Sequence, residues 1–371
     1  MNIEHEIYMR RALELAERGR GRTSPNPMVG AVLVKGGSVV GEGWHRGAGL
    51  PHAEVEALNA AGAAARGATL YINLEPCAHF GRTPPCAPAV AEAGIDTVVA
   101  GMADPNPLVA GRGFEMLREG GVDVIEGVLE NECRELNKGF VKVMAAGLPY
   151  VLLKSAMTLD GKTASFTGDS KWISSVESRA LAHRLRGEYD AVVVGGNTLL
   201  KDNPSLTSRA PEGEKIKDPL RVGLDEELAL PADSNFAQLA ADGKTVIITT
   251  ESAPMAREVE LARLGCKVIR VPVDAGGRPD PAAALKKLAE LGALYVMLEG
   301  GGTVNFSFLS AGLVDRVMIF IAPKLLGGRD AATFLEGDGF PAVSDSIRLS
   351  PLQVKFYGGD IVAEADVIYR S

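Results

Sequence analysis

At 371 residues, the chain is longer than one compact core usually supports, which favours two domains. Its apolar content of 46% and charged content of 23% are ordinary for a globular protein, and its formal net charge of -8 argues against a nucleic-acid surface. The four cysteines are too few for a disulfide framework. Neither a signal peptide nor an apolar run of membrane-spanning length is visible, so we expect a cytoplasmic protein without a membrane partner.

The N-terminal stretch predicts a helix followed by a hairpin. Apolar residues recur at helical spacing across residues 5–18, and a glycine-rich stretch ends the pattern. The apolar runs 31–34 and 39–43 are joined by a Gly-Gly turn, which predicts a β-hairpin. Asn26 lies between two prolines just before the hairpin. Its amide could bind a substrate hydroxyl or ring edge, or it could simply cap a turn.

A second predicted helix starts at Pro51 and carries His52 and Glu54 in its first turn. Cys77 follows the next predicted strand, and Cys86 opens a further helix behind two prolines. One imidazole and two thiolates make three ligands for zinc (Zn2+) and leave a fourth tetrahedral position open, as in catalytic zinc sites. A water bound there would have its pKa lowered to about 7. The positive end of a helix dipole near these ligands would favour the thiolate form.

Glu54 could take a proton from such a water and pass it to a leaving amine. His-x-Glu followed by Pro-Cys and a second cysteine is the signature of zinc-dependent nucleobase deaminases. The cysteines could instead be small buried hydrophobes, and a structural zinc site would need a fourth ligand, for which His79 is the nearby candidate. A structural site would leave Glu54 without a role, so we favour a deaminase.

The remaining elements of the first half alternate strands and helices. A strand at 97–100 and a helix at 114–119 continue a β-α-β pattern, which predicts a three-layer α/β/α domain with a mixed sheet. Gly147-Leu148-Pro149 precedes a new strand at 150–154. We therefore expect two domains, residues 1–146 and 147–371.

The second half alternates continuous apolar runs with helical stretches, which predicts a doubly wound α/β domain. Apolar runs of this kind suit strands that are buried on both faces. The runs are 191–194, 246–249, 268–271 and 294–298, and the helical stretches include 174–186 and 281–291.

Two of these strands end in glycines that open a helix. Val194 is followed by two glycines, and Leu298 by Glu299 and then three glycines. Backbone N–H groups in such a turn can approach a phosphate closely. The spacing is not the Gly-x-Gly-x-x-Gly fingerprint, so a dinucleotide site and plain tight turns both stay open as interpretations.

Longer motifs resemble the family of bifunctional deaminase–reductases of riboflavin biosynthesis. In the first half these are Pro25-Asn26-Pro27, His52-Ala53-Glu54, the eight residues between Cys77 and Cys86, and the segment 104–113. In the second half they are the segments 157–164, 168–174, 198–209 and 322–328. Base-editing and cytidine deaminases usually have two residues between their cysteines, so the longer spacing separates this chain from a nucleic-acid editor.

The resemblance implies a cytidine-deaminase-like domain followed by a dihydrofolate-reductase-like domain. The first would convert 2,5-diamino-6-(5-phosphoribosylamino)pyrimidin-4(3H)-one to 5-amino-6-(5-phosphoribosylamino)uracil and release ammonia. The second would use NADPH to reduce the ribosyl side chain to ribityl phosphate. The partner is then a small pyrimidine ribonucleotide, and the resemblance also suggests a homo-oligomer, a dimer or tetramer, formed through the reductase domain.

The resemblance also implies roles for residues that match the family's motifs. Those expected to hold NADPH are Ala156, Trp172, Thr198, Asp202, Gly301, Gly302, Thr303, Val304, Asn305, Phe306 and Ser307. Those expected to hold substrate are Ser170, Arg186, Leu206, Arg209 and Glu299, with Asn26, His45, His79 and Arg82 as candidates in the first domain. Lys154 and Asp160 could assist proton transfer. The histidines could instead be packed or capping groups, the arginines solvated, and Trp172 part of the core.

One departure from the family concerns the cofactor. Many relatives have a small polar residue after the strand at 220–224, where this chain has Asp225-Glu226-Glu227. Acidic groups would repel an adenosine 2′-phosphate and would suit the free 2′-hydroxyl of NADH. We expect NADPH nevertheless, because Thr249, Thr250 or Arg221 could supply compensating contacts.

Two other functions stay open at this point. One is a tRNA or free-base deaminase with an appended nucleotide-binding domain, which the acidic net charge and the long cysteine spacing disfavour. The other is a non-catalytic regulator that binds zinc and a nucleotide. It would release no ammonia from the pyrimidine.

Overall fold

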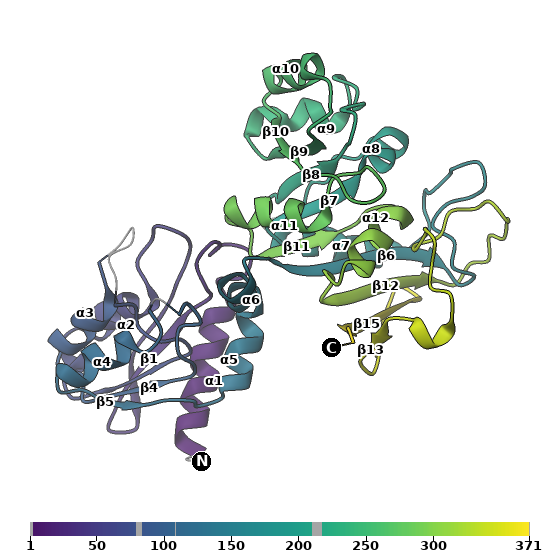
Figure 1. The fold of residues 1–371 in the computed structure, drawn as a ribbon. Helices are drawn as coiled ribbons and strands as arrows, with labels where there is room; N and C mark the ends of the chain where they lie inside the picture. The colour runs from purple at the N-terminus through teal and green to yellow at the C-terminus, as the bar shows by residue number, and fades with distance from the viewer. Residues whose placement is uncertain (1–2, 79–83, 108, 210–216, 371) are drawn as a thin grey trace. The chain divides into compact units, whose positions relative to one another are not determined.

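The computed structural model describes residues 3–78, 84–107, 109–209 and 217–370. The chain forms two compact units, Met1–Gly147 and Leu148–Ser371, each with its own sheet (Figure 1). Among the described residues, no helix has the length and apolar character needed to cross a membrane.

The first unit is built on a mixed sheet with the strand order β2-β1-β3-β4-β5. The β1–β2 and β1–β3 pairs are antiparallel, and the β3–β4 and β4–β5 pairs are parallel. Its strands are β1 (Gly30–Lys35), β2 (Ser38–Trp44), β3 (Thr69–Ile72), β4 (Thr97–Ala100) and β5 (Asp123–Ile125). Its helices are α1 (Ile3–Glu17), α2 (Ala53–Ala61), η1 (Gly62–Ala65), α3 (Cys86–Glu92), α4 (Arg112–Glu119), α5 (Glu130–Leu136) and α6 (Lys138–Ala146).

Helices cover both faces of this sheet. On one face, α2, α3 and α4 bury Ala57, Val90 and Leu117 against alternate strand residues such as Leu33 and Leu70. On the other face, α1 packs on β1 and β3 and contacts α5. This arrangement is the three-layer α/β/α sandwich with a mixed sheet that the sequence predicts.

Two glycines of the hairpin, Gly41 and Gly43, have no Cβ atom and so let α2 lie very close to β2. A Cβ on Gly43 would lie 2.5 Å from the carbonyl oxygen of Ala53, and one on Gly41 would lie 2.4 Å from that of Ala57. Real Cβ atoms do not approach backbone so closely, so only glycine fits at either position. The close contact fixes the N-terminal end of α2 and, with it, His52.

The second unit contains a larger sheet with the order β10-β9-β8-β7-β11-β6-β12-β15-β13, in which β14 also pairs with β15. Its strands are β6 (Tyr150–Thr158), β7 (Ala191–Gly195), β8 (Leu220–Leu224), β9 (Thr245–Thr250), β10 (Lys267–Val271), β11 (Tyr295–Leu298), β12 (Arg316–Ala322), β13 (Arg348–Leu349), β14 (Gln353–Tyr357) and β15 (Asp360–Ile368). Its helices are α7 (Val176–Glu188), α8 (Gly196–Asp202), α9 (Asn235–Gln238), η2 (Leu239–Asp242), α10 (Met255–Arg263), α11 (Pro281–Glu290), α12 (Gly302–Ser310) and η3 (Val343–Asp345).

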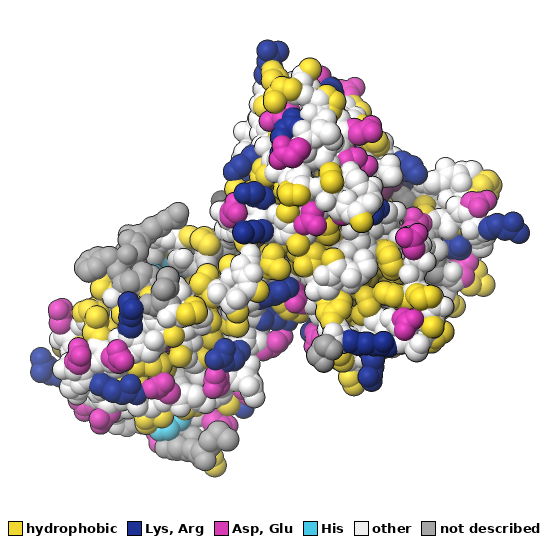
Figure 2. All heavy atoms as spheres, viewed as in Figure 1, with side chains coloured by type: hydrophobic (Ala, Val, Ile, Leu, Met, Phe, Trp, Pro, Cys, Tyr) yellow, Lys and Arg dark blue, Asp and Glu magenta, His cyan; other side chains and the backbone are white. Residues whose placement is uncertain are grey.

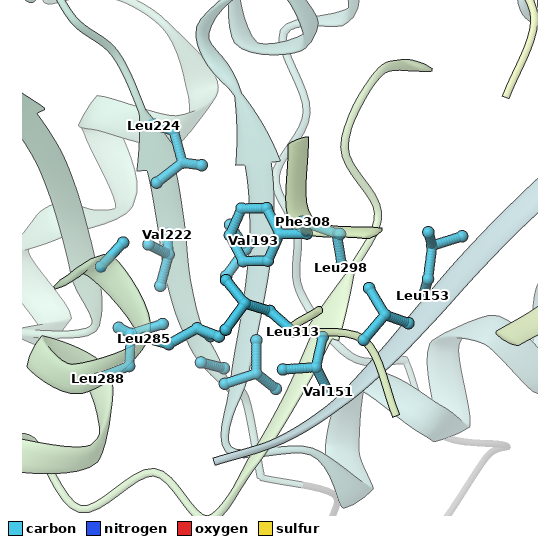
Figure 3. Close-up of a cluster of buried hydrophobic side chains, with 14 of the residues drawn as sticks. Val151, Leu153, Val193, Val222, Leu224, Leu285, Leu288, Leu298, Phe308 and Leu313 are labelled. Atoms are coloured by element: carbon cyan, nitrogen blue, oxygen red, sulfur yellow. The ribbon is translucent and has the colours of Figure 1, made fainter. Parts of the chain in front are cut away.

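The strands from β10 to β12 run parallel, so their carboxyl ends lie at one edge of the sheet. Apolar side chains alternate between two buried clusters along these strands. Figure 3 shows one cluster, in which Val193 and Val222 pack with Leu285 of α11 and Phe308 of α12. Val192 and its alternate neighbours face the other cluster, which α7 to α10 cover. Burial on both faces explains the continuous apolar runs in the sequence.

The structure corrects several predicted elements. The helix expected from Pro51 starts at Ala53, and His52 is its N-cap rather than part of its first turn. Cys77 follows β3 on an irregular segment, so it is not at a helix N-terminus. In the second sheet, β15, which was not among the predicted strands, pairs antiparallel with β12. The helices α5 and α6 were not predicted.

Candidate active sites

His52, Cys77 and Cys86 converge in the first unit, although they are far apart in the chain. His52 Nδ1 lies 3.6 Å from Cys77 Sγ and 3.3 Å from Cys86 Sγ, and the three donor atoms lie within 4.8 Å of one another. Ligands at ordinary zinc bond lengths of about 2.0–2.3 Å lie about 3.6 Å apart around a tetrahedral ion. The spacing and the two sulfur donors therefore fit one zinc ion.

The two thiols differ in their acidity because they lie side by side. Hydrogen bonds from the Cys86 thiol and from His52 lower the pKa of Cys77 to about 4, although burial opposes the shift. The backbone N–H of Cys86, at the start of α3, also donates to Cys77 Sγ at 3.3 Å. The Cys86 thiol donates a hydrogen bond to the Cys77 thiolate and is buried, so the pKa of Cys86 is raised, and repulsion between two neighbouring thiolates adds to the shift. A bound cation would remove that repulsion and stabilise both thiolates.

Glu54 lies in the first turn of α2, beside the sulfur atoms. Its side chain is buried, with 3% of the residue exposed. Burial raises the pKa of Glu54 to about 7, and the Cys77 thiolate adds to the rise. A carboxyl group with such a pKa can both accept and release a proton near neutral pH.

His52, Glu54 and Cys77 line a cavity of 350 Å³, within the range of small-molecule sites. His45 is buried at its wall, and its Nδ1 donates to the carbonyl oxygen of Pro51 at 3.1 Å. Its Nε2 then accepts from Asn26 Nδ2 at 3.0 Å, which fixes the direction of the Asn26 amide. Burial lowers the pKa of His45, in keeping with a neutral ring. His79 and Arg82, which the sequence analysis also suggested here, lie outside the described residues.

Glu75 is a residue of this site that the sequence analysis missed. It lines the cavity and is 5% exposed. Its carboxylate accepts the backbone N–H groups of Asp104, Gly111 and Gly113 at 2.9, 3.0 and 2.7 Å. Glu75 thus anchors a loop that supplies Asp104 to the cavity wall. Its partners lie 29 to 38 residues further along the chain, so no local sequence signal marks it.

The second unit holds a larger cavity of 720 Å³ at the carboxyl ends of its parallel strands. It is lined by Gly195 at the end of β7, Gly196 at the start of α8, and glycines 300 to 302 after β11. A Cβ on Gly195 or Gly300 would lie 2.7 or 3.0 Å from the side chain of Val304, so a side chain at either position would crowd Val304, and glycine leaves the backbone accessible. The nine-residue helix α12 also begins at this wall. An anion such as a pyrophosphate fits a glycine-lined helix N-terminus of this kind.

Glu299 occupies one end of this cavity between two cations. Arg186 donates to its carboxylate from Nε and Nη2 at 2.7 and 3.0 Å, and Lys154 Nζ lies 3.4 Å away. Burial alone would raise the pKa of Glu299, but Arg186 and Lys154 outweigh it and hold the pKa well below its usual range. The guanidinium of Arg186, which was expected to hold substrate, is directed largely at this carboxylate.

The structure brings many of the other expected residues to the same cavity. Those that line it are Ala156, Ser170, Thr198, Asp202, Glu299, Gly301, Gly302, Thr303, Val304 and Ser307. Lys154 lines it as well, beside Glu299.

The remaining expected residues do not line the cavity. Trp172 is 65% exposed beneath Arg179, whose guanidinium lies 4.5 Å from the ring centroid. Asn305 is buried and donates to the Phe334 carbonyl oxygen at 2.8 Å, and Phe306 packs on Phe340. Leu206 is buried, Arg209 is exposed, and Asp160 binds backbone N–H groups of residues 326 and 327.

Comparison with known proteins identifies a matching family for each of the two units. Residues 2–102 match the family model "Cytidine and deoxycytidylate deaminase zinc-binding region", and residues 149–363 match "RibD C-terminal domain". The riboflavin biosynthesis protein RibD of Bacillus amyloliquefaciens is 45% identical over 99% of each chain. The chain belongs to the RibD family.

Other members of the RibD family agree over nearly the whole chain. RibD of Escherichia coli is 39% identical and covers 97% of this chain and 98% of its own. A structure of Acinetobacter baumannii RibD superposes with a TM-score of 0.90 at 36% identity, covering 98% of this chain and 99% of that one. A Thermotoga maritima structure is described as a diaminohydroxyphosphoribosylaminopyrimidine deaminase/5-amino-6-(5-phosphoribosylamino)uracil reductase. It gives a TM-score of 0.82 at 37% identity and covers 98% of this chain and 99% of that chain.

Membership of the RibD family confirms the predicted fold classes, a cytidine-deaminase-like unit followed by a dihydrofolate-reductase-like unit. It also confirms zinc and NADPH as the cofactors that these units use. The family comparisons do not show how the acidic residues 225–227 after β8 affect the choice between NADPH and NADH. The structure gives the positions of these residues.

Of the three acidic residues 225–227 that follow β8, Glu226 alone has a place in the lining of the cavity. Asp225 is buried and accepts the backbone N–H groups of Ala229 and Leu230 at 3.1 and 2.9 Å. Glu226 lines the cavity, whereas Glu227 does not. The compensating contacts suggested for Arg221 do not form, because Arg221 lies at the opposite end of β8 and binds Asp242.

Proposed function

We propose that the chain catalyses two consecutive steps of riboflavin biosynthesis on one phosphorylated intermediate. The first unit would deaminate 2,5-diamino-6-(5-phosphoribosylamino)pyrimidin-4(3H)-one, and the second would reduce the ribosyl group of the product with NADPH. The observation that carries the proposal is the cluster of His52, Cys77 and Cys86 beside the buried Glu54, in a RibD-family chain that also holds a glycine-lined second cavity.

In the first cavity, His52, Cys77 and Cys86 would hold zinc, which supplies a bound water of lowered pKa. Glu54 would take up a proton at its carboxylate and release it to the departing amine, a role that its pKa of about 7 supports. Asn26, oriented by His45, would hydrogen-bond the pyrimidine edge. The walls would exclude bulk water from the ring.

In the second cavity, the glycines and the start of α12 would hold the pyrophosphate of NADPH, which supplies the hydride. Glu299 would accept hydrogen bonds from hydroxyls of the sugar. Lys154 Nζ would donate the proton that the sugar oxygen needs when its carbon receives the hydride. Arg186 would act mainly by positioning Glu299, because two of its N–H groups are directed at that carboxylate.

The substrate in this proposal is a small molecule and not a nucleic acid. On the face shown in Figure 2, basic and acidic side chains of the described residues are interspersed rather than gathered into a basic surface. A nucleic-acid deaminase needs such a surface to neutralise phosphates. The four cysteines are all free, which supports a reducing compartment, the cytoplasm.

We also propose that the chain is a dimer or tetramer joined through the second unit. Large apolar side chains are exposed on its C-terminal strands, including Val354 at 51% and Phe356 at 73%. Exposed apolar groups that lie together mark interaction surfaces. We expect Phe356→Glu to lower the mass found by sedimentation, and a monomeric wild type would refute the assembly.

The direct test is anaerobic incubation of the chain with the diaminopyrimidine phosphate and NADPH, following ammonia and nicotinamide absorbance together. We expect ammonia without NADPH, and NADPH oxidation only after deamination. Cytosine and tRNA serve as control substrates, from which no ammonia should form. Ammonia from either control, or none from the pyrimidine, would refute the proposed substrate.

A further inference from the structure

The far end of the second cavity carries charged side chains that the reduction itself does not use. Glu226 follows β8, and Asp274 and Arg278 belong to the loop after β10; all three line the cavity. Lys154 and Glu299 line the opposite end, at β6 and β11. In the sheet, β8 lies three strands from β6, a separation of about 14 Å.

The order of these groups along the sheet decides which part of a dinucleotide meets them. The glycines that follow β7 and β11 lie between the two ends. If the pyrophosphate lies on these glycines and the nicotinamide lies near Lys154, the adenosine ribose reaches Glu226 and Arg278. This step rests on the proposed reductase function.

Glu226 presents an exposed carboxylate from a fixed backbone. Its carbonyl oxygen accepts the hydroxyl groups of Thr249 and Thr250 at 3.1 and 3.2 Å. Both threonines are therefore committed to the Glu226 backbone. A carboxylate at this position accepts a hydrogen bond from a free ribose 2′-hydroxyl and repels a 2′-phosphate.

Arg278 would favour a 2′-phosphate over a 2′-hydroxyl, and hydrogen bonds hold its loop in place. Asp274 Oδ1 accepts the backbone N–H groups of Gly276 and Arg278 at 2.8 and 3.0 Å. Arg278 Nη2 lies 3.3 Å from Asp274 Oδ2, whereas Nε is buried without a hydrogen-bond partner. A guanidinium group suits a phosphate, but Asp274 offsets much of its charge.

We propose that this end of the cavity accepts NADH as well as NADPH, with weak discrimination between them. Glu226 receives the 2′-hydroxyl of NADH, and Arg278 meets the 2′-phosphate of NADPH. The reduction is the same with either donor, because a hydride passes to the sugar carbon and a proton to its oxygen in both cases. The two donors differ only at the ribose.

Equilibrium titration of the full chain with NADPH and with NADH, followed by nicotinamide fluorescence, tests the proposal. We expect the two dissociation constants to lie within about thirtyfold of each other. Glu226→Gln should shift their ratio by at least about fivefold towards NADPH, and Arg278→Gln by a similar factor towards NADH. The matched control is Glu227→Gln, an exposed neighbour outside the cavity, which should leave the ratio unchanged.

The outcomes separate this inference from the proposed function. NADPH binding more than about thirtyfold tighter than NADH overturns the inference and leaves the reductase function standing. A shift below fivefold in either cavity variant, or an equal shift in the control, overturns it as well. Failure of both dinucleotides to bind would instead refute the reductase function.

Discussion

Glu54 combines burial with proximity to a thiolate, and these two features together set its proton affinity. Its pKa of about 7 means that both protonation states are populated near neutral pH. A side chain that must collect a proton and then give it up is most effective under that condition. Glu56 lies in the same helix but is partly exposed and lies 3.3 Å from Arg46. It therefore lacks the burial and the neighbouring thiolate that raise the pKa of Glu54.

We expect Glu54→Gln to reduce deamination by about 100- to 10,000-fold, because the amide cannot carry the proton. The zinc content should stay near one ion per chain, because His52, Cys77 and Cys86 remain. Ammonia release and metal analysis measure the two effects, with Glu56→Gln as the control. Full activity of the Glu54 variant would exclude this residue as the proton carrier.

Glu75 gives a second prediction at the level of one side chain. Its carboxylate accepts three backbone N–H groups, whereas a glutamine would present an NH2 group to at least one of them. An unsatisfied buried donor costs roughly 2 kcal/mol, so we expect Glu75→Gln to lower the unfolding free energy of the first unit by about that amount. Denaturant unfolding measures it, and the exposed Glu119→Gln should change little. An equal loss in both variants would contradict the anchoring role.

The turn that follows β6 holds the loop after β12 in place through hydrogen bonds. Asp160 accepts the backbone N–H groups of Leu326 and Gly327, and the hydroxyl of Thr158 donates to it at 2.5 Å. The Thr158 hydroxyl and then the two N–H groups lower the pKa of Asp160 to about 2. The carboxylate is exposed, so the effect is local ordering rather than a large contribution to global stability.

The pH dependence of this contact follows from the direction of the shift. A folded pKa of about 2 lies below the unfolded value of about 4, so the stabilisation is present above pH 4 and is lost as the pH falls through 2. We expect the protection of the Leu326 and Gly327 amides from hydrogen exchange, corrected for intrinsic rates, to fall between pH 4 and pH 2. Asp160→Asn should lack this pH dependence. An unchanged profile in that variant would show that another group is responsible.

The elements also show what sequence patterns can and cannot predict. Continuous apolar runs predicted the buried strands β7, β9 and β11, because burial on both faces leaves a strong signal. The helix α5 was missed because its N-cap is Leu129, in a left-handed conformation that no sequence pattern announces. The short strand β5 is partly exposed and carries little apolar alternation.

The residues of the candidate sites also differ in whether the sequence alone could reveal them. His52 and Glu54 are neighbours in the chain, so their association was visible as a motif. Glu75 and Arg278 act through loops that only the folded sheet brings to a cavity, so spacing could not reveal them. Arg186 was expected to hold substrate, and that role stays a prediction; its pairing with Glu299 joins α7 to the end of β11 and depends on tertiary packing.

At the scale of the whole molecule, each unit has a core of its own. The buried cluster around Leu70 and Val98 lies entirely within the first unit, and the clusters around Val193 and Val192 lie within the second. Separate cores allow separate unfolding transitions. Zinc binds only the first unit in our proposal, and a dinucleotide only the second.

We therefore expect calorimetry to resolve two transitions that respond to different ligands. Removing zinc with a chelator should lower the transition of the first unit alone, because metal binding stabilises the fold that holds it. NADPH at about 100 times its dissociation constant should stabilise the second unit by about 2.7 kcal/mol and leave the first unmoved. A single transition that both ligands shift together would show that the units unfold as one.

The contact between α2 and the hairpin has a consequence for how mutations in this chain are interpreted. Gly43 touches no substrate atom in the proposed reactions, yet a Cβ there would meet the backbone of α2 at 2.5 Å. Alanine at this position would displace the helix end that carries His52. In a mutational scan it would be scored among the inactive variants, although no metal ligand or proton carrier had changed. Tolerance to substitution in this unit therefore reports the spacing of its backbone as much as its chemistry.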